Sequence, residues 1–157
     1  MLNESLQAVE KLDLPFPWET NARGQIIMTP HGYIHSFRAG QLGRIFDAIA
    51  PKWRCGNQLG IFTADGLKGP DVTLASPEYH ARHLKDTGYV TEAPEICVEV
   101  MSPSNSWQEM QDKMPLYFEV GALEVWVVDV EGKVFFFADG NEKLQNSRLI
   151  PEAPQYI

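Results

Sequence analysis

Apolar and polar positions follow two different periods along the chain, and each period predicts one kind of element. Between Ile34 and Ala50, apolar side chains recur at helical spacing, which predicts a long helix that Pro51 ends. Between Trp18 and Met28, two short strand-like runs flank a polar Asn-Ala-Arg-Gly turn, which predicts a β-hairpin.

The clearest pattern lies in the second half of the chain. Residues 96–101 and 123–130 are nearly continuous apolar runs, typical of strands buried on both faces. Residues 104–120 between them are predicted to form a helix, with Ser104 or Asn105 as its N-cap. A strand, a helix and a strand in this order indicate a βαβ unit. Together with the hairpin and the first long helix, they predict an α/β fold with a mixed sheet flanked by helices.

The remaining segments are shorter. We expect a short helix at 5–12, an interrupted strand over 53–63, a loop at 64–69, a strand at 72–75, an irregular stretch at 76–93, a strand at 134–137 and then a polar tail with few elements. Pro115 lies inside the predicted 104–120 helix and is expected to kink it. The chain has 157 residues and no repeat or long linker, so we expect a single domain over 1–157.

Two carboxylates interrupt apolar strands, and they are the most informative chemistry in the chain. Asp71 begins the apolar run 72–75, and Glu99 lies inside the run 96–101. A carboxylate is costly to bury without a partner, so two of them on neighbouring strands indicate a shared positive partner. A hard divalent cation such as Mg²⁺ fits, because it prefers carboxylate oxygens and keeps several waters. With Lys113 on the following helix, the chain has the parts of a metal-dependent phosphodiesterase.

The net charge and the cysteine spacing of the chain limit the partners and the cellular location that we expect for this site. Lys and Arg number 13 against 21 Asp and Glu, a net charge of −8, which argues against a generally basic nucleic-acid-binding surface. A local basic patch or a bound cation remains compatible with that charge. Cys55 and Cys97 show no CxxC spacing, so we expect reduced core cysteines and a cytoplasmic location. The first residues lack the pattern of a signal peptide, and no apolar run approaches ~20 residues, so we expect no membrane span.

Three segments occur in a recognisable order: Gly69-Pro70-Asp71-Val72, Val98-Glu99-Val100-Met101-Ser102-Pro103-Ser104, and the stretch from Lys113 through Gly121-Ala122-Leu123 to Asp129. With the upstream hairpin and His35, this order resembles the bacterial Uma-two family of restriction endonucleases, in the PD-(D/E)XK nuclease superfamily. The resemblance covers residues 12 to 138. It implies a restriction-endonuclease-like mixed β-sheet flanked by α-helices. Met101 stands where the nuclease pattern expects Lys, and the family's lysine on the following helix matches Lys113.

The resemblance also implies roles for the site residues. Asp71 and Glu99 would hold Mg²⁺ (or Mn²⁺), with the backbone carbonyl of Val100 as a further candidate ligand. The metal would polarise the scissile phosphate and lower the pKa of a bound water, while Lys113 would stabilise the developing negative charge or orient the nucleophile. The accessory candidates are Glu19, His35, Ser102 and Glu109. Each has a structural alternative, such as an ion pair between Glu109 and Lys113 four residues apart.

We therefore predict a metal-dependent endonuclease that hydrolyses DNA phosphodiester bonds by metal-activated water. A homodimer is expected by analogy with restriction-type nucleases, with the strand Val125 to Val128 as a candidate interface. The basic segment His80 to Lys85 is the local candidate for phosphate contact, with a solvated loop as its alternative. Two other functions stay open: a catalytically inactive nuclease-fold binding or assembly module, and the hydrolysis of another phosphoester. The chain has no G-x-S-x-G, Walker A, H-E-x-x-H or G-x-G-x-x-G motif, so other common catalytic classes find no support.

Overall fold

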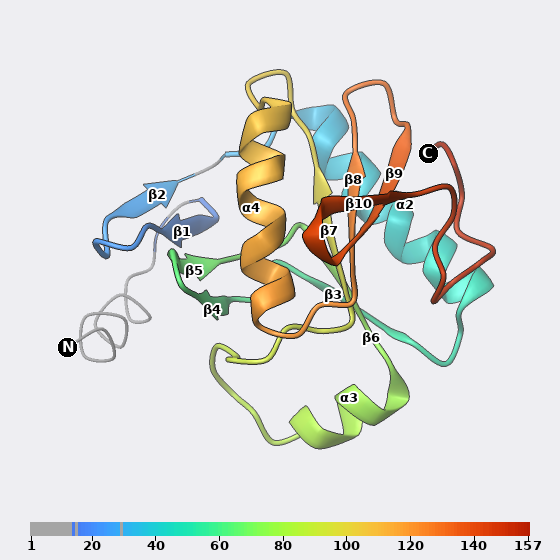
Figure 1. The fold of residues 1–157 in the computed structure, drawn as a ribbon, viewed down its shortest axis with the longest axis horizontal. Coiled ribbons are helices and arrows are strands. Elements are labelled where there is room, and N and C mark those ends of the chain that lie inside the picture. The colour runs from blue at the N-terminus through green and yellow to red at the C-terminus, as the bar shows by residue number, and fades with distance from the viewer. Residues whose placement is uncertain (1–13, 15, 29) are drawn as a thin grey trace.

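A mixed six-stranded sheet forms the centre of the computed structural model, which describes residues 14, 16–28 and 30–157 (Figure 1). The strands of this sheet are β3 (Arg54–Asn57), β6 (Val72–Ala75), β7 (Ile96–Val100), β8 (Glu124–Val128), β9 (Val134–Ala138) and β10 (Glu142–Leu144). Their order is β10-β9-β8-β7-β6-β3. Within the sheet, β7 and β8 pair in parallel and every other pair of neighbours is antiparallel. The predicted α/β mixed sheet and the βαβ unit are therefore confirmed.

Helices cover both faces of this sheet. The helices are α2 (Tyr33–Ile49), α3 (Pro77–His83), α4 (Trp107–Glu119) and the short 3-10 helix η1 (Asp139–Asn141). Figure 1 shows α4 in front of the sheet and α2 behind it. Phe46 of α2 packs with Trp126 in one core cluster, and Tyr117 of α4 packs with Cys97 in the other. Because side chains alternate along a strand, Glu99 in β7 faces the same side as Cys97, toward α4.

Two hairpins lie to one side of the central sheet (Figure 1). They are β1 (Trp18–Thr20) with β2 (Ile26–Met28), and β4 (Ile61–Thr63) with β5 (Gly66–Lys68). Thr20 joins them: the Leu67 N–H donates to its Oγ1 and the Lys68 Nζ donates to its carbonyl, both at 2.8 Å. The hairpin predicted between Trp18 and Met28 is confirmed.

Two predictions about this region were wrong. The segment 53–63 is two strands in different sheets, and the chain turns between them with Gln58 at a φ of +50°. The segment 64–69 is not a loop, because it contains β5. The turn into β5 depends on Gly66, whose φ is +86° and where a Cβ would lie only 2.5 Å from the Asn21 carbonyl oxygen.

The helix boundaries also differ from expectation. Helix α3 occupies part of the segment 76–93 that was predicted to be irregular. The Ser76-Pro77 pair is a sequence signal for the start of this helix. In the structure, Ser76 caps the helix by accepting the Tyr79 N–H, and Pro77 is its first residue. Helix α4 begins after Ser106, which forms a reciprocal capping box with Glu109, so the predicted caps at Ser104 and Asn105 were wrong.

Helix α4 continues through Pro115 as a single helix. Proline has no N–H for the carbonyl four residues earlier, which here belongs to Gln111. That carbonyl instead accepts a hydrogen bond from Asn141 Nδ2 at 3.2 Å. A partner from outside the helix therefore compensates for the missing bond.

The C-terminal segment and the strand Val125 to Val128 also differ from the predictions. The predicted polar tail contributes β10, and its Ile150 and Ala153 are buried in the core. The strand Val125 to Val128 is completely buried within the chain, so the prediction of a dimer interface there was wrong. The helix expected at 5–12 lies outside the described residues. In the described part of the chain, no helix is both long and apolar enough to cross a bilayer.

Candidate active site

Asp71 and Glu99 are neighbours at one end of the β6–β7 pair. Val72 is opposite Val98 in the register, so Asp71 and Glu99 are the next residues on each side. Both are largely buried, with exposed fractions of 6% and 5%. The structure thus brings together the two carboxylates that the sequence singled out.

Asp71 is held by two hydrogen-bonding groups on the same oxygen. Its Oδ2 accepts the Val100 N–H at 2.7 Å and lies 3.1 Å from His35 Nε2. Burial raises the pKa of this carboxyl, but the contacts with His35 and Val100 outweigh burial and hold the pKa below its ordinary value. Asp71 is therefore the stably ionised carboxylate of the site.

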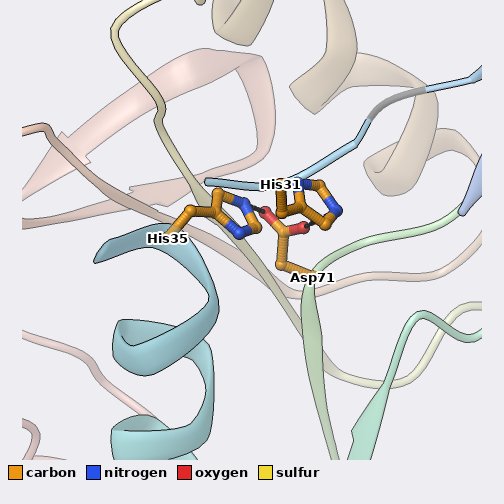
Figure 2. Close-up of side chains that lie close together, drawn as sticks. All are labelled: His31, His35 and Asp71. Atoms are coloured by element: carbon orange, nitrogen blue, oxygen red, sulfur yellow. Dashed lines mark ion pairs between the residues drawn. The ribbon is translucent and has the colours of Figure 1, made fainter. Parts of the chain in front are cut away.

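Two histidines stand over this carboxylate (Figure 2). The rings of His31 and His35 are stacked, with centroids 3.8 Å apart and planes within 5°. His31 Nε2 lies 3.6 Å from Asp71 Oδ1, on the opposite oxygen from His35. One ligand atom from each of the three residues lies within 4.8 Å of the others, which is close enough to consider a shared metal ion. Burial lowers the pKa of His31, which favours the neutral imidazole that binds metals.

Glu99 is held from helix α4. Its Oε1 accepts the Tyr117 hydroxyl at 2.5 Å and lies 2.9 Å from Lys113 Nζ. Its Oε2 has no hydrogen-bond partner among the described residues. Burial raises the pKa of Glu99 to about 8, because the effect of burial and of the neighbouring carboxylate of Asp71 exceeds the opposing effect of Lys113.

Lys113 links Glu99 to the first hairpin. Its Nζ donates to Glu19 Oε1 at 2.7 Å, and the same oxygen of Glu19 accepts the Gly69 N–H at 3.0 Å. Burial lowers the pKa of Lys113, but the carboxylates of Glu99 and Glu19 raise it further, to above its ordinary value. Lys113 is therefore a charged ammonium held between two carboxylates, one from β1 and one from β7.

The charges of this cluster do not balance. Glu19, Asp71 and Glu99 supply three carboxylates, and Lys113, which pairs with Glu19 and Glu99, supplies the one ammonium among these four groups, which leaves −2 when all four are ionised. Without a cation, a proton on Glu99 relieves part of this excess, as its raised pKa indicates. A divalent cation would relieve it completely, and carboxylate oxygens are its preferred ligands. The residues present therefore fit a divalent metal ion.

A cavity of about 640 Å³ opens beside these groups. The charged and polar residues Glu19, His31, Asp71, Glu99 and Lys113 line one part of it. Apolar and aromatic side chains make up much of the remaining lining, among them Phe16, Trp18, Met28, Tyr89 and Met110. The site is thus open to a ligand larger than a water molecule.

Three further candidates have different positions. Val100 and Ser102 both line the cavity, and the Ser102 hydroxyl hydrogen-bonds Asn105 within the turn that follows β7. Glu109 does not line it: its carboxylate accepts from Asn105 and from the Ser106 N–H, as part of the α4 cap. The structural alternative, an ion pair between Glu109 and Lys113, is also absent among the described contacts, because Lys113 pairs with Glu19 and Glu99 instead.

The basic segment predicted for phosphate contact lies elsewhere. It belongs to α3 and the turn after it, and α3 follows the end of β6 that is opposite to Asp71. Two of its side chains have acidic partners: Arg82 pairs with Glu92, and His83 lies between Asp86 and Glu92. Arg82 and His83 are therefore already paired with carboxylates, and the segment lies beyond the end of β6 that is opposite to Asp71.

A comparison with models of protein families identifies the family of this chain. The model of the family Uma2, described as "Putative restriction endonuclease", matches residues 9–154. The chain belongs to the Uma2 family. The comparison with curated proteins found no match.

A solved structure supports the fold of this Uma2 chain. It is the crystal structure of a "putative nuclease belonging to DUF820" from Anabaena variabilis ATCC 29413. The two chains share 20% sequence identity with a TM-score of 0.71, over 91% of this chain and 82% of the other. The expected nuclease-like mixed α/β fold is thereby confirmed, while this low identity carries no conclusion about chemistry.

Sequence reasoning missed two residues of the Uma2 chain's site. Tyr117 follows Lys113 by four positions on α4, so helical spacing already places both on one face. His31 precedes His35 by four positions, but it lies before the helix begins and spacing alone does not bring the two rings together. Only the three-dimensional arrangement shows that both histidines meet Asp71.

Proposed function

We propose that this protein is a metal-dependent endonuclease that hydrolyses DNA phosphodiester bonds by metal-activated water. The observation that supports this most strongly is the charge of the buried cluster. Glu19 and Glu99 pair with one lysine beside a cavity that Asp71 also lines, and the free Oε2 of Glu99 and Oδ1 of Asp71 are available as ligands. Membership of the Uma2 family supports DNA as the substrate.

Asp71 and Glu99 would hold the cation, Mg²⁺ or Mn²⁺, with the Val100 carbonyl as a further candidate ligand. When bound, such a cation lowers the pKa of a water and polarises the scissile phosphate. The chain's own groups orient these ligands. The Val100 N–H and His35 fix one oxygen of Asp71, and Tyr117 fixes one oxygen of Glu99. Such outer hydrogen bonds keep ligand oxygens aimed at the ion.

Lys113 would act by its charge. Because its pKa is raised, it stays protonated and cannot take a proton from water. An ammonium fixed next to the cavity would stabilise negative charge that develops on the phosphate oxygens. Glu19 holds this ammonium in place, so Glu19 is a positioning residue.

Two further expectations carry over from the sequence. A homodimer and a cytoplasmic location remain predictions for this protein, and the dimer would use a surface other than the buried strand β8. The inactive nuclease-fold module and the hydrolysis of other phosphoesters become outcomes of the experiment that follows.

The test combines metal binding with cleavage. Mn²⁺ is titrated by calorimetry into the wild type, Glu99→Gln and the control Glu119→Gln, which changes an exposed glutamate of α4. Plasmid cleavage is measured in the same buffer. We expect binding and cleavage in the wild type and control, and loss of both in Glu99→Gln. A folded wild type that binds no Mn²⁺ would overturn the proposal in favour of the inactive module. Cleavage of small phosphodiesters but of no DNA would indicate the third function.

A further inference from the structure

The two oxygens of Asp71 have different surroundings. Oδ2 is occupied by the Val100 N–H at 2.7 Å and by His35 at 3.1 Å. Oδ1 has no hydrogen bond among the described residues, and His31 Nε2 lies 3.6 Å from it (Figure 2). Asp71 therefore offers one saturated oxygen and one that remains free for a ligand.

The separation of 3.6 Å between His31 Nε2 and Asp71 Oδ1 is informative. It is too long for a hydrogen bond between nitrogen and oxygen, which requires about 2.7–3.2 Å. It is close to the spacing of two ligands on one metal ion, since bonds of about 2.0–2.2 Å place neighbouring ligands roughly 3.0–3.5 Å apart. His31 Nε2 has no other polar partner among the described residues. It therefore faces the free oxygen of Asp71 without a hydrogen bond of its own and is available to coordinate a metal ion.

His35 is less suited to be a ligand, although it lies closer to Asp71. Its Nδ1 is buried and has no hydrogen-bond partner among the described residues. Coordination through Nε2 would move the ring proton to Nδ1, where the N–H would be buried without an acceptor at a cost of about 1–3 kcal/mol. The proton is better placed on Nε2, where it is donated to Asp71 Oδ2. His35 then fixes the carboxylate, as groups behind a metal ligand do.

We infer that His31 supplies an imidazole ligand to the cation held by Asp71, and that the site is thereby adapted to a first-row transition-metal ion in preference to Mg²⁺. This inference rests on the proposed metal site and narrows the ion that it takes. Mg²⁺ binds oxygen ligands and gives up its waters reluctantly, whereas imidazole nitrogen suits the later divalent ions. His31 belongs to the segment between β2 and α2, so the connection that leads into α2 would carry the metal preference.

The experiment uses the full chain and three variants. His31→Gln removes the proposed ligand, and His35→Gln removes the group behind Asp71. His80→Gln is the matched control, because His80 lies on α3 beyond the other end of β6. Binding of Co²⁺ and Mg²⁺ is measured by calorimetry, and pulsed EPR of the Mn²⁺-loaded protein reports whether an imidazole nitrogen is coordinated. Circular dichroism confirms that each variant is folded.

We expect His31→Gln to weaken Co²⁺ binding at least tenfold and Mg²⁺ binding less than threefold. The nitrogen signal of bound Mn²⁺ should be present in the wild type, His35→Gln and His80→Gln, and absent in His31→Gln. A nitrogen signal that persists in His31→Gln, or that disappears only in His35→Gln, would overturn the inference.

Failure of this inference can be told from failure of the proposed function. Mn²⁺ binding that depends on Glu99 but shows no nitrogen signal would refute the role of His31 and leave the proposed metal site intact. A nitrogen signal that depends on His31 but persists in Glu99→Gln would support the His31 site and contradict the proposed ligand set. The absence of any divalent binding would refute both.

Discussion

Two glutamates are buried in neighbouring parallel strands, and their surroundings differ. Glu124 at the start of β8 is 2% exposed, and both of its oxygens accept hydrogen bonds. Its four donors are Trp126 Nε1, Ser147 Oγ and the Arg148 and Leu149 N–H groups, at 2.7–3.1 Å. Glu99 in β7 uses one oxygen for Tyr117 and Lys113 and leaves the other without a partner among the described residues.

The difference separates a structural carboxylate from one that is available for chemistry. Four neutral donors compensate Glu124 for the water it has lost, so it fixes the C-terminal segment to the sheet. Glu99 lies beside a cavity, shares a lysine with Glu19 and has a raised pKa. Burial of a carboxylate therefore does not identify a site, whereas an unfilled oxygen next to a counter-charge does.

The strongest test of this comparison is Glu99→Gln. We expect cleavage to fall at least 100-fold, about 3 kcal/mol of transition-state stabilisation, because the metal ligand is lost. Thermal stability should stay equal to or exceed that of the wild type, since the variant removes a buried ionisable group. Plasmid cleavage and thermal melting measure the two effects, and a folded variant with wild-type activity would contradict the role of Glu99.

The converse variant is Glu124→Gln. An NH₂ group replaces one carboxylate oxygen, and this group cannot accept hydrogen bonds from the donors around it. We therefore expect the free energy of unfolding to fall by about 2–3 kcal/mol. Mn²⁺ affinity should change less than threefold, because Glu124 has no contact with the site. Urea unfolding and calorimetry check this, and an unchanged stability would remove the distinction between the two glutamates.

A third prediction concerns pH. Without metal, the pKa of Glu99 is about 8 when folded, against an ordinary value of 4.5. Between these values the folded chain holds a proton that the unfolded chain has released, so stability falls as pH rises from 5 to 8. The slope contributed by this group is at most about 1.4 kcal/mol per pH unit.

The same pH series separates Glu99 from its neighbours. Asp71 has a lowered pKa, so its contribution is lost only as pH falls below its ordinary range, and that of Lys113 only at strongly alkaline pH. Urea unfolding of metal-free wild type and Glu99→Gln should therefore differ in slope between pH 5 and 8. Parallel curves would show that Glu99 does not titrate there.

The smallest expected effect is that of Tyr117→Phe, which removes the hydroxyl that donates to Glu99 Oε1. Loss of one hydrogen bond to a buried carboxylate costs roughly 1–2 kcal/mol, so Mn²⁺ affinity should fall roughly five- to thirtyfold. Calorimetry measures this. A loss as large as that of Glu99→Gln would mean that Tyr117 does more than orient its neighbour.

Sequence reasoning reached the centre of the fold and much of the site. Continuous apolar runs identified β7 and β8, since strands buried on both faces need no polar alternation. It singled out Glu99 and passed over Glu124. Both glutamates interrupt apolar strands, and the sequence does not show the hydrogen-bond partners that distinguish a structural carboxylate from an available one. It also missed β5 and the packed tail, where Gly66 and contacts with distant segments decide the structure.

The bond between Glu19 and Lys113 joins residues 94 positions apart. Its formation requires that the first hairpin meet a helix made much later in synthesis, after three of the six strands of the central sheet, β3, β6 and β7. A chain that is still emerging, or only partly folded, therefore cannot hold its lysine in place. If the protein cuts DNA, this long-range closure would act as a quality check that withholds activity from incomplete molecules.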